Sequence, residues 1–196
     1  MTAMTGDPGM VLAADAARVE VPIRVADPAW KAAGGICATI RRAARAVIRE
    51  LAATGPEESG RVKSGPVEIS VLLTGDAEVR GLNRDYRKVD AATNVLAFAS
   101  GDPRPAPGAP RLLGDVVLAY GTVRREAEER KLDFSHHLAH LVVHGVLHLL
   151  GYDHLAAAEA EAMERAEVQI LANLGIGDPY RRGRIGTLSG TPTKER

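Results

Sequence analysis

The sequence has a single cysteine, Cys37, among its 196 residues. One cysteine excludes an internal disulfide framework and a zinc finger built on cysteines, and it is typical of a protein from a reducing compartment. No stretch approaches the roughly 18 consecutive apolar residues of a membrane span, and the N-terminal residues lack the basic start of a signal peptide. The sequence therefore predicts a soluble, cytoplasmic protein with no membrane contact and no disulfide partner.

Net charge is lacking as well, because 25 lysine and arginine residues are balanced by 25 aspartate and glutamate residues. A neutral chain gives no global electrostatic argument for a nucleic-acid partner, so any basic surface must be local. What the chain does have is an ordinary apolar fraction of 45%, which is enough to build a hydrophobic core.

The pattern of apolar residues predicts an α+β protein in which helices cover a small mixed β-sheet. We expect a single domain over residues 18–180, a flexible N-terminal extension over residues 1–17 and a disordered tail over residues 181–196. Strands are expected at residues 18–25, 67–73, 94–99 and 113–120, and helices at about 30–53, 122–131, 135–150 and 156–174, with a further short helix through Leu82 and Tyr86.

Two residue types refine these boundaries. Pro22 has no backbone N–H to donate, which favours an edge position for the first strand. Thr74 or Asp76 is expected to cap the helix that continues to Tyr86.

In the helix at 30–53, the three arginines at positions 41, 45 and 49 recur every fourth residue. This stripe is either a solvated helix face or a contact for an RNA backbone.

The stretch HGVLHLLGYDH, residues 144–154, contains three of the six histidines. His144 and His148 lie one helical turn apart on the same face and can reach one cation. Gly151 can adopt the left-handed conformation that ends a helix, so that the following turn brings His154 back to the same ion. Three imidazoles leave a fourth position for water, and the sequence therefore predicts a catalytic metal site at the end of a helix.

Zinc is the expected ion, one per chain, although three imidazoles also suit nickel or copper. His136 and His140 continue the same row of histidines towards the N-terminus. They are either partners of the metal ligands or ordinary helix residues.

Gly145 occupies the position that holds a glutamate base in zinc peptidases with a similar histidine spacing. A glycine inside a helix costs about 1 kcal/mol relative to alanine, so it needs a reason. One reason is close packing against a neighbouring element, and another is room for a bulky group such as a phosphodiester beside the metal. The second reason favours a phosphoester over a peptide substrate. The basic residues Arg84, Arg87 and Lys88 agree with it, because arginine can bind a phosphate through two N–H groups.

Three segments together resemble the YbeY family of bacterial metal-dependent single-strand endoribonucleases. They are HGVLHLLGYDH, LNRDYRKVDAATNVLAF and LLGDVVLA, and the stretches HHLAHLVVHG and LANLGIGDPY also resemble the family. The likeness spans about residues 18–180. Ala97 and Ala99 depart from the family pattern, where a serine and a proline are often found, and this departure concerns the end of one strand rather than the histidine motif.

The resemblance implies a zinc endoribonuclease that matures the 3′ end of small-subunit rRNA and acts in ribosome quality control. Its partners would be single-stranded RNA and the ribosome or small-subunit proteins. It also implies roles for individual residues, with the general base left open. His144, His148 and His154 would be the zinc ligands, Arg87 would face the substrate and act in catalysis, and Asp115 and Asp153 would be supporting groups, Asp153 with a catalytic role. Arg84 and Lys88, which belong to the same basic segment as Arg87, are expected to help bind the substrate.

Aromatic residues make up only 4% of the chain, so base stacking should be limited and contacts to the RNA backbone should dominate. Two alternatives to the nuclease remain open. The first is a metallohydrolase of another substrate, such as a degenerate peptidase. The second is a non-enzymatic ribosome assembly factor in which zinc only fixes the fold, with the fourth coordination position closed by a side chain such as Asp153.

Overall fold

The structure is a computed structural model that describes residues 18–54, 65–101, 109–153 and 156–181. The predicted extension at 1–17, most of the tail at 181–196 and the third predicted metal ligand, His154, lie outside these residues. The strands are β1 (Val19–Glu20), β2 (Ile23–Val25), β3 (Val67–Thr74), β4 (Val95–Ala99) and β5 (Arg111–Ala119). The helices are a short 3₁₀ helix, η2 (Pro28–Ala32), and α1 (Ile36–Thr54), α2 (Asp76–Arg87), α3 (Tyr120–Glu129), α4 (Phe134–Leu149) and α5 (Ala157–Asn173).

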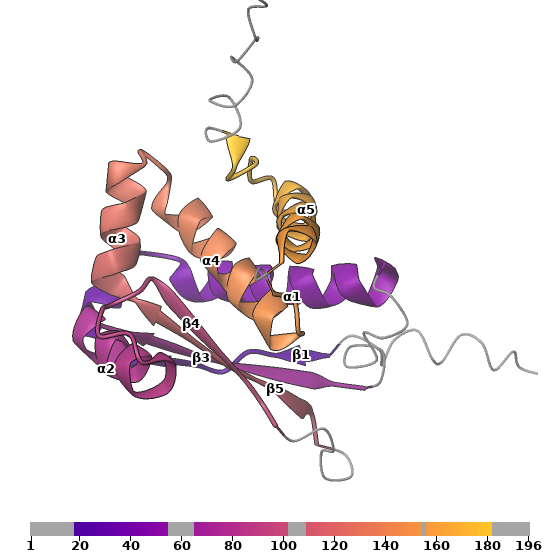
Figure 1. Cartoon of the computed structure of the whole chain (residues 1–196). Coiled ribbons are helices and arrows are strands. Elements are labelled where there is room, and N and C mark those ends of the chain that lie inside the picture. Colours follow the sequence, from indigo (N-terminus) through magenta and orange to yellow (C-terminus); the bar gives the residue numbers. More distant parts are fainter. Residues whose placement is uncertain (1–17, 55–64, 102–108, 154–155, 182–196) are drawn as a thin grey trace, which may run out of the picture.

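The strands form one mixed sheet in the order β1-β3-β5-β4, with β2 also paired to β3. The strands β1, β2 and β5 run parallel to β3, and β4 runs antiparallel to β5. In Figure 1 the helices α1, α4 and α5 lie together on one side of this sheet. The predicted α+β architecture, a small mixed sheet covered by helices, is therefore confirmed.

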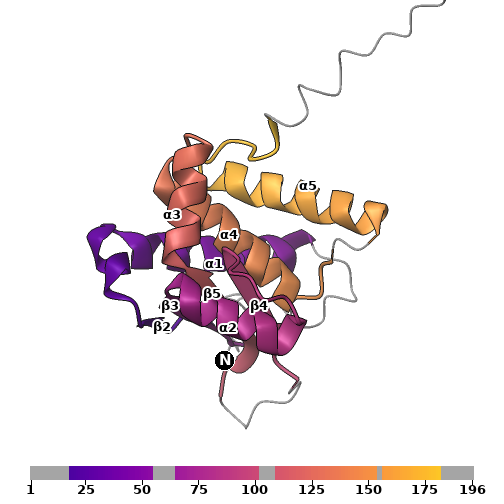
Figure 2. The same cartoon turned by 60° about the vertical axis from the view of Figure 1, so that its left-hand side comes forward.

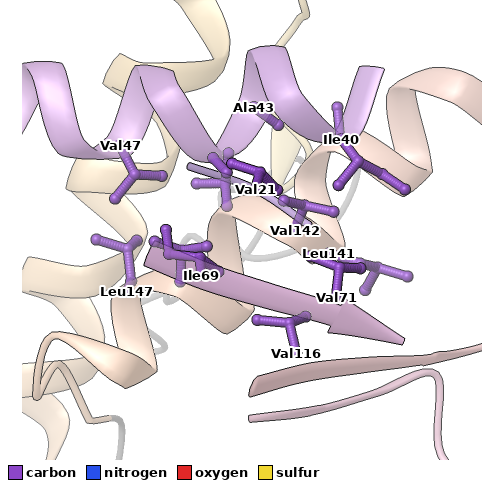
Figure 3. Close-up of a cluster of buried hydrophobic side chains, with 14 of the residues drawn as sticks. Val21, Ile40, Ala43, Val47, Ile69, Val71, Val116, Leu141, Val142 and Leu147 are labelled. Atoms are coloured by element: carbon purple, nitrogen blue, oxygen red, sulfur yellow. The ribbon is translucent and has the colours of Figure 1, made fainter. Parts of the chain in front are cut away.

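Alternation along the strands divides the core into two layers, because successive side chains of a strand point to opposite faces. On one face, Ile69 and Val71 of β3 pack against Ile40 and Val47 of α1 and against α4 (Figure 3). On the opposite face, a smaller cluster joins α2 to the sheet; it contains the buried residues Val79, Leu96, Val117 and Ala119. The larger layer is the one that positions α4.

The N-terminal elements differ from the prediction in two places. The expected strand at 18–25 is interrupted between β1 and β2, because Pro22 cannot donate a backbone hydrogen bond, but it lies at the sheet edge as expected. The expected helix at 30–53 begins at Ile36, since Gly35 has a left-handed backbone with φ of 76°. Trp30 instead belongs to η2, is fully buried, and donates its indole N–H to the Thr74 carbonyl at 2.9 Å.

The predicted cap of α2 is wrong. The N-cap of this helix is Gly75, without a side-chain hydrogen bond, and Asp76 is already the first helical residue. The Asp76 carboxylate instead accepts the backbone N–H of Thr122 at 2.9 Å, in the first turn of α3. This carboxylate stabilises the N-terminus of a neighbouring helix, where negative charge is favoured.

Among the helices that the structure describes, none is long and apolar enough to cross a membrane.

Candidate metal centre

The candidate site lies at the C-terminal end of α4. Asp133 caps the start of this helix by accepting the backbone N–H of His136 at 3.0 Å. Gly151 ends it with φ of 91°, as predicted, and the N–H of Tyr152 then bonds back to the Leu147 carbonyl at 3.1 Å. The helix α4 therefore ends at a defined residue, and the chain turns away from the helix axis at Gly151.

The two histidines of these turns point their outer ring nitrogens at one another. The Nε2 atoms of His144 and His148 are 3.1 Å apart, and the ring centroids are 4.6 Å apart. Zn–N bonds of 2.0–2.1 Å in tetrahedral geometry place two ligand nitrogens roughly 3.3–3.4 Å from each other. The spacing is thus close to that of two ligands of one zinc ion.

Hydrogen bonds to the Nδ1 atoms fix the tautomer of these two rings. The Nδ1 atom of His144 lies 2.8 Å from a carboxylate oxygen of Glu167, and that of His148 lies 2.9 Å from the backbone carbonyl of Tyr152. Both oxygens can only accept a hydrogen bond, so each Nδ1 carries a proton, and in the neutral tautomer of each ring Nε2 presents a lone pair. Two lone pairs this close repel unless a proton or a cation lies between them. The donor set therefore fits a metal ion.

Glu167 of α5 is the residue that orders this side of the site. It is fully buried and accepts hydrogen bonds from three groups on two other segments. These are His144 at 2.8 Å, His140 at 3.1 Å and the Tyr180 hydroxyl. A carboxylate that binds the second nitrogen of a metal-ligating histidine fixes its tautomer and raises its basicity.

Burial alone would disfavour the charge on this carboxyl group. Hydrogen bonds from His140, His144 and Tyr180 outweigh that burial and hold the pKa of Glu167 at about 2. Burial and the contact with Glu167 in turn raise the pKa of Tyr180 above its usual range, so the phenol stays protonated and donates. The group is therefore a carboxylate surrounded by donors.

Glu167 was not predicted from the sequence, although a signal for it exists. Along α5 the buried positions are Met163, Glu167, Ile170 and Leu171, at helical spacing. A glutamate in an apolar stripe is a buried polar residue, and such a residue needs partners. His140 also donates to Glu167, the carboxylate that binds His144, whereas His136 is exposed. Of the two interpretations of these histidines, a partner of the predicted metal ligands therefore fits His140, and an ordinary helix residue fits His136.

The third predicted ligand remains a prediction, because His154 lies outside the described residues. Among the residues that are described, no group of three or more His, Cys, Asp or Glu side chains could hold a metal ion. The described part of the centre is thus the pair His144 and His148 with Glu167 behind it. Asp153 is described and half-buried, one residue after Tyr152, and its catalytic role remains a prediction.

Gly145 packs against the sheet. A Cβ atom built there would lie 3.1 Å from the Val116 Cγ1 atom of β5 and 3.4 Å from the Val95 Cγ2 atom of β4. Of the two reasons expected from the sequence, close packing is confirmed. Room for a phosphodiester at this residue is wrong, because the vacant side of the glycine faces β4 and β5.

The same substitution at two helical glycines tests this assignment. Gly81→Ala in α2 meets no atom within 4 Å, so we expect a gain of about 0.5–1 kcal/mol in the free energy of unfolding from helix propensity. Gly145→Ala should gain nothing or lose up to about 2 kcal/mol, because overpacking offsets that propensity. Urea denaturation of both variants measures the difference. Equal gains would show that α4 does not need a glycine at this point.

The predicted substrate-binding residues lie at the end of α2. Arg87 is exposed and its guanidinium donates to the Ala97 carbonyl of the edge strand β4 at 3.4 Å. Arg84 forms an exposed ion pair with Asp85 at 2.9 Å, and Lys88 donates to the Asp85 carbonyl at the same distance. Arg87 thus contacts β4, a strand on which α4 packs, whereas Arg84 and Lys88 contact Asp85.

Asp115 lies on the other face of the sheet from the histidine pair. On β5 its neighbour Val116 faces α4, where it meets Gly145, so the Asp115 side chain points to the opposite face of the sheet. There it lines a shallow pocket with Ser70 and Arg24. The Asp115 side chain therefore lies on the face of the sheet away from α4, and its supporting role stays a prediction.

Comparison with known proteins decides the family. The sequence model described as endoribonuclease YbeY matches residues 37–175, which include the histidine pair, Arg87 and Glu167. The chain belongs to the YbeY family. The resemblance expected from the sequence is thereby confirmed.

Relatives in the YbeY family are similar over much of the chain. A protein of Bradyrhizobium sp. named endoribonuclease YbeY is 55% identical over 119 residues, which are 59% of this chain and 70% of that protein. Another with the same name, from Rhodospirillum rubrum, is 47% identical over 173 residues, 84% of this chain and 85% of its own. The solution structure of a Thermotoga maritima protein aligns with a TM-score of 0.49 and 19% identity over 90% of this chain and 99% of its own.

Proposed function

We propose that the protein is a zinc-dependent endoribonuclease that cuts single-stranded RNA in the cytoplasm. We further propose that it matures the 3′ end of small-subunit rRNA and acts in ribosome quality control together with the ribosome or small-subunit proteins. The observation that carries the proposal is the 3.1 Å approach of two imidazoles whose other nitrogens are already bound to acceptors. Membership of a family named for endoribonuclease activity supports RNA as the substrate.

In this proposal the zinc ligands are His144, His148 and His154. When bound, the ion would supply Lewis-acid chemistry, polarising a phosphate oxygen or acidifying a water molecule. Glu167 and the Tyr152 carbonyl hold the first two imidazoles in the tautomer that presents Nε2. Asp153 is the candidate supporting group nearest to the ligands in sequence, and the general base is not assigned.

Arg87 has the role of binding the RNA phosphate and stabilising the charge that develops on it. Its guanidinium is exposed, and its contact in the described residues is to a backbone carbonyl, which orients the group without neutralising its charge. Arg84 and Lys88 would add positive charge nearby, Arg84 less because it is paired with Asp85. A preorganised donor at developing charge commonly contributes a factor of about 10²–10³ to kcat.

Cleavage of a labelled single-stranded RNA tests the proposal, with wild type and Arg87→Ala loaded with zinc side by side. We expect wild type to cut the single strand and to leave the same sequence intact as a duplex. Arg87→Ala should keep its zinc and lose about 10²-fold in kcat. Arg165→Ala, which removes an exposed arginine paired with Glu161 on α5, serves as the control and should cut like wild type.

Two other outcomes would reject the proposal, and a third would change the role of Arg87 alone. Peptide cleavage by wild type beside intact RNA would favour a metallohydrolase of another substrate. Zinc binding without any hydrolysis, together with binding to ribosomal subunits, would favour an assembly factor. Equal cutting by wild type and Arg87→Ala would remove Arg87 from the mechanism.

A further inference from the structure

A groove of about 610 Å³ runs between α1 and the C-terminal end of α5. Figure 2 shows these two helices on the same side of the sheet. Three arginines of α1 line the groove, at positions 42, 45 and 49, together with Glu50, Asn173 of α5 and Leu174, which caps the end of α5. The sequence suggested a stripe that began at Arg41, and the groove instead uses its neighbour Arg42.

The charge of this groove departs strongly from that of the chain. The helix α1 has four arginines and one glutamate, so its net charge is 4 − 1 = +3, whereas the whole chain is neutral. None of the three lining arginines forms an ion pair with a carboxylate in the part of the chain that the structure describes. The positive charge is therefore concentrated on one local surface.

The contacts of these arginines orient them without neutralising them. Arg42 donates to the Leu174 carbonyl at the end of α5, and Arg45 donates to the Val19 carbonyl at 3.4 Å. Glu50, the one acid lining the groove, accepts the Asn173 amide at 3.0 Å. Three guanidinium groups against one carboxylate leave an excess of two positive charges in the groove.

The spacing of the arginines suits a chain of phosphates. Positions 42 and 49 are seven residues apart, so the three side chains spread over about 10 Å of the helix axis. A guanidinium fork matches phosphate geometry, and repeated phosphates along a strand can meet several forks at once. An acidic protein partner would offer carboxylates, but the large charge density of a nucleic acid matches this patch better.

We propose that this groove binds the phosphate backbone of single-stranded RNA outside the metal centre. The proposal rests on the proposed function for the identity of the polyanion. The groove residue Asn173 lies six residues after Glu167 on α5, about 9 Å along the axis, so the groove begins about two helical turns from the residue that contacts His144. The groove would therefore lower the Kd and KM for RNA and leave kcat unchanged.

The test compares wild type with Arg45→Gln/Arg49→Gln. Arg42 is kept because its bond to the Leu174 carbonyl also supports the end of α5. Binding to a labelled, unstructured RNA is followed by fluorescence anisotropy at several salt concentrations with a chelator present, so that no cleavage occurs. A thermal melt of each protein confirms that it is folded.

Loss of two phosphate contacts should reduce the slope of log K against log salt by about 1.4, at about 0.7 per contact for a single strand. With equal binding at 1 M salt, this slope corresponds to roughly 25-fold weaker binding at about 0.1 M salt. The control is Arg18→Gln/Arg165→Gln, which removes two exposed arginines that already pair with Glu20 and Glu161. It should retain the wild-type slope.

Cleavage assays separate this inference from the proposed function. If zinc-loaded wild type cuts RNA but Arg45→Gln/Arg49→Gln keeps the wild-type slope, the groove does not bind RNA and the nuclease assignment stands. If wild type cuts nothing but the groove variant loses slope and the control does not, the groove binds RNA and the nuclease assignment fails. Equal losses in the groove variant and the control would also overturn the groove, because the effect would then be one of net charge.

Discussion

Glu167→Ala is expected to weaken zinc binding by about 10- to 100-fold, the usual cost of removing the group behind a metal-ligating histidine. The carboxylate accepts His144 Nδ1 at 2.8 Å and thereby keeps the Nε2 lone pair directed at His148. Without it the His144 ring can rotate or change tautomer. Competition with a chromogenic zinc chelator measures the change in affinity.

The same substitution should also reduce the stability of the metal-free protein by about 2–4 kcal/mol. Three donors lose their common acceptor, and each buried donor without a partner costs about 1–3 kcal/mol, part of which water recovers. Glu161→Ala, at an exposed position of the same helix, is the matched control and should change neither quantity. If Glu167→Ala bound zinc as tightly as wild type, the carboxylate would be a structural group of the α4–α5 interface alone.

His148→Ala is expected to remove stoichiometric zinc binding and to reduce RNA cleavage by about a thousandfold or more, since metal catalysis contributes several kcal/mol. The substitution deletes one of the two nitrogens that meet at 3.1 Å and frees the Tyr152 carbonyl. The fold should persist, because His148 is only half-buried and alanine is a strong helix former.

His136→Ala separates this effect from the general loss of a histidine. His136 lies on the same helix and in the same row, but it is exposed. Its variant should keep one zinc per chain and full cleavage. Zinc retention by His148→Ala, measured by elemental analysis after gel filtration, would mean that the ion is held elsewhere.

Features that depend on neighbouring residues in the chain could be predicted from the sequence. The i, i+4 spacing of His144 and His148 and the left-handed glycine at 151 are local, and both appear as expected. The sheet and its covering helices also follow from the apolar patterns. The boundaries that failed, at residues 30–35 and at the cap of α2, depend on which backbone groups find partners after folding.

Features that depend on tertiary packing could not be predicted in the same way. The partners of Glu167 come from α4 and from Tyr180, and nothing in the spacing of α5 says which histidines it meets. The reason for Gly145 required knowing that Val116 and Val95 face it. The side of the sheet occupied by Asp115 likewise required the register of β5 against α4.

In our proposal, zinc held by the histidines at the end of α4 makes this chain an endoribonuclease. The most direct test of this claim is the rate at which metal-free protein cuts a labelled single-stranded RNA as zinc is added. We expect no cutting without metal, a rise that ends at one zinc per chain, and no rise with His148→Ala. Cutting at the full rate without metal, or an equal rise with His148→Ala, would contradict the claim.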